Sequence, residues 1–199
     1  MKKVYEIAKP FLSIILGALL LLTYMNLLGA NGAALAFGII AIVFSAYYLV
    51  AGVLSLVIGE KLGETARRWL EIVAVALFPL LFFVYRLLIA IGGGLGINGW
   101  ILAILGMVSA LALVVFLFVS ALSKAKLAGR LATLAGVIFA VILILVILFD
   151  IIGDPIAFGD ILPVELITNI VYGALLFPFL TRLSKKEDGK EGEGSAPNE

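Results

Sequence analysis

Six apolar runs, each about 18 to 26 residues long, constrain the fold of this chain more than any other feature. They lie at about 11–28, 33–58, 69–91, 99–122, 131–152 and 161–180, with short charged or glycine-rich segments between them. A helix of about 20 apolar residues crosses the roughly 30 Å hydrocarbon core of a bilayer. The sequence therefore predicts an all-α, polytopic membrane protein with six transmembrane helices in residues 1–183, and the lipid bilayer as its main partner.

The composition excludes several functional classes. The chain is 64% hydrophobic and 14% charged, whereas a soluble domain has about a quarter of its residues charged. It has no cysteine and no histidine, so disulfides, Cys/His metal sites and histidine-based triads are excluded. Its net charge of +1 offers no electrostatic basis for binding nucleic acid. We expect no enzyme, no catalytic residue, no metal and no cofactor.

The basic residues predict how the chain is oriented. With six spans, thirteen of the fourteen Lys and Arg residues lie in segments on one side. The positive-inside rule makes this side cytoplasmic, so both termini are expected there, in the cell membrane. The segment 184–199 is charged and has no apolar face, which predicts a disordered cytoplasmic tail. The first run could also be a cleaved signal peptide, but it is longer than the usual 7–15 apolar residues, roughly, so an uncleaved helix is favoured.

Two segments suggest an internal repeat. The second run opens with "NGAALAFG" from Asn31, and the fourth opens with "NGWILAILG" from Asn98. Each continues to a Leu-Ser pair, followed by a short basic loop. Spans two–three and four–five could be two copies of one hairpin in the same orientation, a parallel repeat. The alternative is that membrane hairpins of similar composition resemble one another by chance.

Small residues and prolines predict how the helices pack. Small residues four apart allow close approach of helices, either within one chain or in a homodimer, and packing within the chain is favoured. They are Ala34, Gly38, Ala41, Ser45, Gly106, Ala110, Ala132, Gly136 and Ala140. Pro79 and Pro178 are expected to bend the third and sixth helices, and each leaves a backbone carbonyl without its helical partner.

A polar cluster is predicted in the outer half of the bundle. Arg86 is the one basic residue there, and Asp150 and Glu165 are acids at a matching depth. Asn169 and Tyr172 follow Glu165 at i+4 and i+7, so all three share one helix face. Thr168 lies beside that face, and Thr23 near the outer end of the first span.

This cluster admits more than one role. Arg86 could form a structural ion pair with Glu165 or Asp150, could extend to the headgroups, or could bind an anionic ligand. The first functional hypothesis is a transport-related protein with a small-molecule site in the outer half. The alternative is a non-catalytic membrane component that assembles with a partner membrane protein or a second copy of itself.

Overall fold

Helices account for all the regular secondary structure in the part of the chain that the structure describes. This computed structural model describes residues 2–59, 61–92, 94, 96–123, 126–153 and 162–192, without the side chains of residues 2–4, 6, 126, 150, 151, 153, 162, 163, 165 and 183–192. The elements are α1 (Lys2–Tyr24), the 3-10 helix η1 (Met25–Gly29), α2 (Ala33–Ile58), α3 (Glu64–Ile91), α4 (Ile97–Leu122), α5 (Lys126–Gly153) and α6 (Leu162–Gly192). The predicted all-α fold is confirmed.

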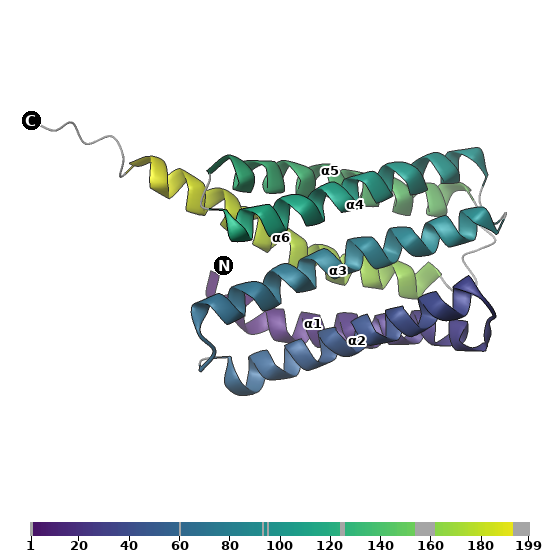
Figure 1. The fold of residues 1–199 in the computed structure, drawn as a ribbon, viewed down its shortest axis with the longest axis horizontal. Helices are drawn as coiled ribbons and strands as arrows, with labels where there is room; N and C mark the ends of the chain where they lie inside the picture. Colours follow the sequence, from purple (N-terminus) through teal and green to yellow (C-terminus); the bar gives the residue numbers. More distant parts are fainter. Residues whose placement is uncertain are drawn as a thin grey trace, which may run out of the picture.

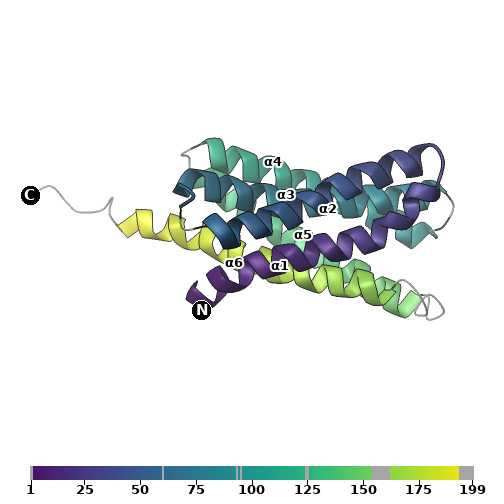
Figure 2. The ribbon, with the colours of Figure 1, turned by 90° about the horizontal axis from the view of Figure 1, so that it is seen from below.

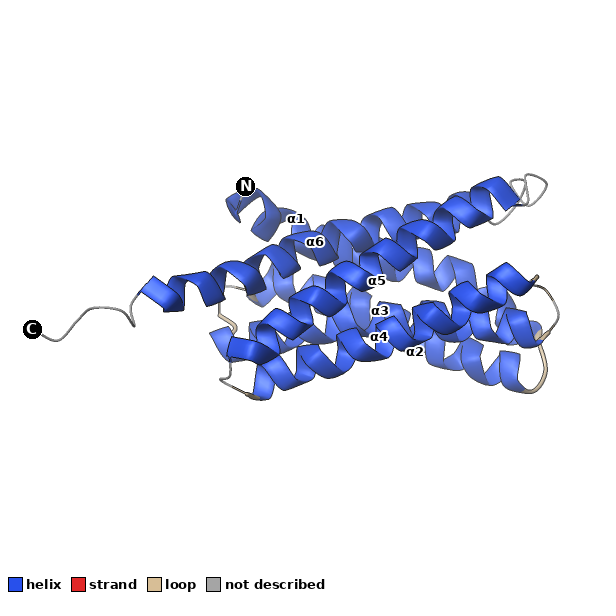
Figure 3. Ribbon diagram, turned by 90° about the horizontal axis from the view of Figure 1, so that it is seen from above, coloured by secondary structure: helices blue, strands red, loops and turns tan. Residues whose placement is uncertain are grey.

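The lengths of the helices match a membrane protein. Five of them, α1 to α5, are long and apolar enough to cross a bilayer, and α6 contains a shorter apolar stretch, Leu166–Arg182. Figure 3 shows the helices as a single bundle of roughly parallel rods.

The helices pack in a ring whose weakest contact is that between α2 and α3. Going round the ring, α2 packs on α1, α1 on α6, α6 on α5, α5 on α4, and α4 on α3. The N-terminus, the α2–α3 and α4–α5 connections and the end of α6 all lie at one end of the bundle (Figures 1 and 2). We call it the basic end, because every Lys and Arg whose backbone is described, except Arg86, belongs to a segment at or near it. The other end is the far end.

The outer surface is apolar, and α3 is the central helix. Rows of isoleucine, leucine and valine side chains on α2, α4 and α5 are exposed. Among the large apolar side chains of α3, only Ile91 at its last position is exposed. Such a surface would be unfavourable in water, but lipid tails cover it at no cost.

Close contact between helices depends on small residues. A Cβ on Gly17 would lie 2.8 Å from the Ser45 carbonyl oxygen, and a Cβ on Gly52 would lie 2.8 Å from that of Pro10. The backbones of α1 and α2 therefore touch at two levels. Most of the predicted small residues are buried inside the bundle, as packing within the chain requires: Gly38, Ala41, Ser45, Gly106, Ala110, Ala132, Gly136 and Ala140.

Four helices extend at least five residues beyond their predicted apolar runs, and α5 is one of them, since it begins at Lys126 and not at 131. α1 begins at Lys2 and α3 at Glu64, because the polar residues before each run are good helix formers. Glu64 also lies in the first turn of α3, where a negative charge stabilises the helix. α6 continues to Gly192, so residues 184–192 of the predicted disordered tail are helical here, while 193–199 lie outside the described residues.

The predicted repeat is not visible in the packing. Helices α4 and α5 pack along much of their length, whereas α2 and α3 contact one another little. The two hairpins thus have similar sequences at their starts but different interhelical contacts. A duplication in the sequence stays a prediction.

Candidate functional site

Both cavities described below lie where α1, α3 and α6 meet, a region that we call the α1–α3–α6 junction. One is in the basic half of the bundle and the other in the far half. The same three helices carry the internal prolines, Pro10, Pro79 and Pro178. A proline inside a helix removes one backbone hydrogen bond, so these helices are the ones most easily bent.

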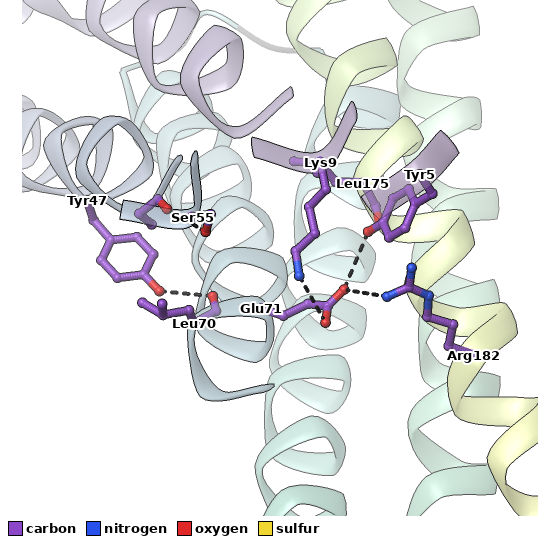
Figure 4. Close-up of polar contacts among 9 residues, drawn as sticks. Tyr5, Lys9, Tyr47, Ser55, Leu70, Glu71, Leu175 and Arg182 are labelled. Atoms are coloured by element: carbon purple, nitrogen blue, oxygen red, sulfur yellow. Dashed lines mark hydrogen bonds and ion pairs between the residues drawn. The ribbon is translucent and has the colours of Figure 1, made fainter. Parts of the chain in front are cut away.

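The basic-end cavity is built around Glu71. Its carboxylate lies 3.1 Å from Lys9 Nζ on α1 and 3.6 Å from Arg182 Nη1 on α6 (Figure 4). The hydroxyl of Tyr5 donates to Glu71 Oε1 at 3.5 Å and to the Leu175 carbonyl at 3.1 Å. The guanidinium of Arg182 also lies over the Tyr5 ring, 4.4 Å from its centroid. We call Tyr5, Lys9, Glu71 and Arg182 the basic-end cluster, and it joins all three helices.

The cavity beside this cluster is lined by both polar and apolar side chains. Its volume is about 30 Å³, which is enough for a few water molecules. It is lined by Tyr5, Lys9, Pro10, Ser13, Ala51, Ser55, Arg67, Leu70, Glu71, Ala74, Val75 and Leu175. Two of its hydroxyls already donate to the backbone of α2, Ser13 to the Tyr48 carbonyl at 2.9 Å and Ser55 to Ala51 at 2.7 Å.

Pro79 interrupts α3 in the middle of the junction, and tyrosines from two other helices repair the interruption. Pro79 has no N–H for the Val75 carbonyl, and the hydroxyl of Tyr172 on α6 donates to that carbonyl at 2.8 Å. One residue earlier in α3, the hydroxyl of Tyr48 on α2 accepts from the Phe78 N–H at 3.1 Å and donates to the Ala74 carbonyl. The interrupted segment of α3 is thereby attached to α2 and α6.

An aromatic layer separates the two halves of the junction. The rings of Phe78 and Tyr172 stack with their centroids 4.2 Å apart, and Phe82 stacks on Phe78 at 5.7 Å. Phe139 meets Tyr172 edge-on at 6.1 Å. Phe78 and Phe82 line the far cavity, and the hydroxyl of Tyr172 bonds Val75, which lines the basic-end cavity, so this layer lies between the two cavities.

The far cavity has a volume of about 10 Å³. It is lined by Leu20, Thr23, Tyr24, Phe78, Phe82, Thr168 and Asn169. Asn169 is only 5% exposed, and its Oδ1 has no hydrogen-bond partner among the described residues. The hydroxyls of Thr23 and Thr168 donate to carbonyls of their own helices, at 2.8 Å and 2.6 Å. Three side-chain oxygens therefore belong to one small cavity.

Arg86 lies next to the far cavity and is not part of its lining. It is 5% exposed, and its guanidinium carbon lies 5.4 Å from the centroid of Phe82, whose ring lines the cavity. The Arg86 side chain is therefore packed inside the bundle and is not extended toward the headgroups. The side chains of its predicted partners, Glu165 and Asp150, lie outside the described residues, so that pairing stays a prediction.

Comparison with known proteins adds no assignment. No protein-family model matches the chain, and neither the curated proteins nor the solved structures include one that is significantly similar.

The structure brings together part of the predicted polar cluster and divides it by role. Asn169 faces the far cavity with Thr23 and Thr168, as a polar pocket in that half requires. Tyr172, one turn further along the same face, instead binds the backbone of α3. Of the predicted cluster, the described side chains are Arg86, Asn169 and Tyr172, and all three are buried.

Sequence reasoning missed the basic-end cluster. A signal was present, because Glu71 lies inside the predicted third span at 69–91 and is the only acid in that run. An acid within a span is normally paired and is a functional candidate. Lys9 comes just before the first predicted span and Arg182 just after the sixth, so both lie at about the depth of Glu71, and both form ion pairs with it.

Proposed function

We propose that this chain is a transport-related membrane protein whose solute path follows the α1–α3–α6 junction. One observation carries the proposal: two polar-lined cavities in opposite halves of the bundle share the same three helices. Polar side chains are unfavourable in contact with lipid, and polar groups inside a membrane protein commonly mark a pathway. The small-molecule site belongs to the far half, at Asn169.

The helices of the junction are suited to movement. Each has an internal proline, and discontinuous helices beside a central site are a recurrent feature of transporters. The basic-end cluster closes one end of the path, and the layer around Phe78 and Tyr172 closes the middle. Opening toward the basic end requires Glu71 to separate from Lys9 or Arg182.

We further propose that the basic end faces the cytoplasm and that the chain resides in the cell membrane. The argument is the segregation of thirteen of the fourteen Lys and Arg residues to segments at that end. Basic residues near the ends of transmembrane helices are retained on the cytoplasmic side. The far cavity then lies toward the outside.

A second candidate function is supported by the filled centre of the bundle. The far cavity is too small for an organic molecule, and the aromatic layer leaves no continuous passage. A protein that only assembles with a partner membrane protein, or with a second copy of itself, needs no passage. For this alternative the polar groups of the junction serve helix packing alone.

Single-cysteine labelling separates the two candidates, because the chain has no cysteine of its own. Ser13→Cys probes the basic-end cavity and Thr168→Cys the far cavity. In sealed vesicles, a charged, impermeant thiol reagent should label Ser13→Cys only from the basic side and Thr168→Cys only from the far side. Val108→Cys, on the lipid-facing surface of α4, is the negative control, and Lys61→Cys in the exposed α2–α3 connection is the positive one. Labelling of both junction positions at the Val108→Cys rate would favour the assembly role.

A further inference from the structure

The far cavity offers at least three hydrogen-bond acceptors, the side-chain oxygens of Thr23, Thr168 and Asn169. A threonine hydroxyl has one hydrogen to donate and two lone pairs. Thr23 donates its hydrogen to the Leu19 carbonyl and Thr168 donates its hydrogen to the Val164 carbonyl. Both oxygens retain the ability to accept a hydrogen bond from a molecule in the cavity.

Asn169 is the lining residue that most needs a hydrogen bond from such a molecule. Its side chain comes from α6 and is 5% exposed, and its Oδ1 has no partner among the described protein groups. A buried acceptor left without a hydrogen bond is destabilising, because the loss of its hydration is not compensated. A molecule that donates to Asn169 Oδ1 removes this cost, and one that also donates to Thr23 bridges α6 to α1.

The size and charge of the lining narrow the choice of molecule. A volume of about 10 Å³ is close to the smallest that holds one water molecule. None of the described lining residues is charged. Burying an ion without a countercharge is very costly, and the nearby Arg86, held over the Phe82 ring, carries the same sign as a cation. Aromatic rings of Tyr24, Phe78 and Phe82 make up the remaining walls.

We propose that the far cavity is a binding site for one neutral, water-sized hydrogen-bond donor, held between Asn169, Thr168 and Thr23. Water is the molecule of this class that every buffer supplies. This site specifies which kind of molecule the far half of the proposed path selects. That molecule is a small, uncharged donor of hydrogen bonds. Any part that the site plays in transport rests on the proposed function.

An experimental structure at a resolution that reveals ordered water tests the site directly. The expected result is one density peak at about 2.7–3.2 Å from Asn169 Oδ1 and within reach of a threonine hydroxyl. The peak should be absent in Asn169→Leu, which removes the acceptor and fills the space. Thr23→Val, a smaller change, should weaken or displace the peak if Asn169→Leu does not fold.

Thallous ion, Tl⁺, tests the competing possibility that the far cavity is a cation site. Data from protein in thallium nitrate should contain no anomalous peak in the far cavity. A Tl⁺ peak there would make it a cation site, and a cavity without density in the wild-type protein would remove the proposal. The outcome is separate from cysteine labelling: an occupied site with no labelling of Ser13→Cys or Thr168→Cys leaves the binding site and removes the path.

Discussion

The attachment of Tyr172 to the interrupted backbone of α3 leads to a quantitative prediction. Tyr172→Phe removes the hydroxyl that donates to the Val75 carbonyl at 2.8 Å, and Pro79 cannot replace it. A buried carbonyl then loses its partner, which costs about 1–3 kcal/mol, so we expect a loss of about 2 kcal/mol. For a protein of this size that corresponds to a fall in Tm of about 4–8 °C.

The control and the rescue make this prediction specific. Tyr47→Phe removes a hydroxyl that donates to the Leu70 carbonyl at 3.0 Å, but Ala74 can still donate its N–H to that carbonyl. Its cost should be about 0.5–1 kcal/mol. In a Pro79→Ala background the helix regains an N–H for Val75, so Tyr172→Phe should cost about 1 kcal/mol less than in the wild type.

The assay is thermal or denaturant unfolding in detergent of the wild type, each single variant and the Tyr172→Phe/Pro79→Ala pair. Equal losses for Tyr172→Phe and Tyr47→Phe would refute the reasoning. So would strict additivity of Tyr172→Phe with Pro79→Ala, because the hydroxyl would then not be compensating for the missing N–H.

Three further predictions follow from the packing, the ion cluster and the charge pattern. Gly52→Ala should destabilise the protein by about 1–3 kcal/mol in the same unfolding assay, because the new Cβ would meet a carbonyl oxygen of α1 at 2.8 Å. Gly173→Ala is the control and should be neutral, because the nearest neighbour of its new Cβ lies at 3.8 Å. Glu71→Ala should lower stability by about 1–3 kcal/mol because it removes the carboxylate that pairs with two half-buried cations, and the difference from wild type should shrink as salt is raised. An unchanged stability in low salt would contradict the pairing. A topology reporter fused after Gly94 should report the outside of the cell, and one fused after Lys190 should report the cytoplasm. An external signal from the fusion after Lys190 would contradict the proposed orientation.

Much of the architecture is predictable because it depends on local sequence. Long apolar runs specify the helices, and glycine-rich or charged segments separate them. A proline in mid-span predicts a carbonyl without a helical partner, and Val75 is that carbonyl. The polar face containing Asn169 and Tyr172 follows from spacing alone.

The rest depends on which helices become neighbours and on how each is rotated. Spacing places Asn169 and Tyr172 on one face, but only the packing of α6 on α3 makes one of them line a cavity and the other bind a backbone carbonyl. Depth in the membrane alone does not identify the partners of Glu71, because it leaves the position of each helix around the ring undetermined. The contact of Lys9 and Arg182 with Glu71 requires that α1, α3 and α6 converge at the basic end.

The central claim, a path along the α1–α3–α6 junction closed by the basic-end cluster, has one most direct test. In sealed vesicles, Glu71→Gln is combined separately with Ser13→Cys and with Thr168→Cys, and labelling rates by an impermeant thiol reagent are measured from each side. Weakening the cluster should raise the rate at Ser13→Cys from the basic side and lower the rate at Thr168→Cys from the far side. If Glu71→Gln changes neither rate, or raises both equally, the basic-end cluster does not control access to a shared path.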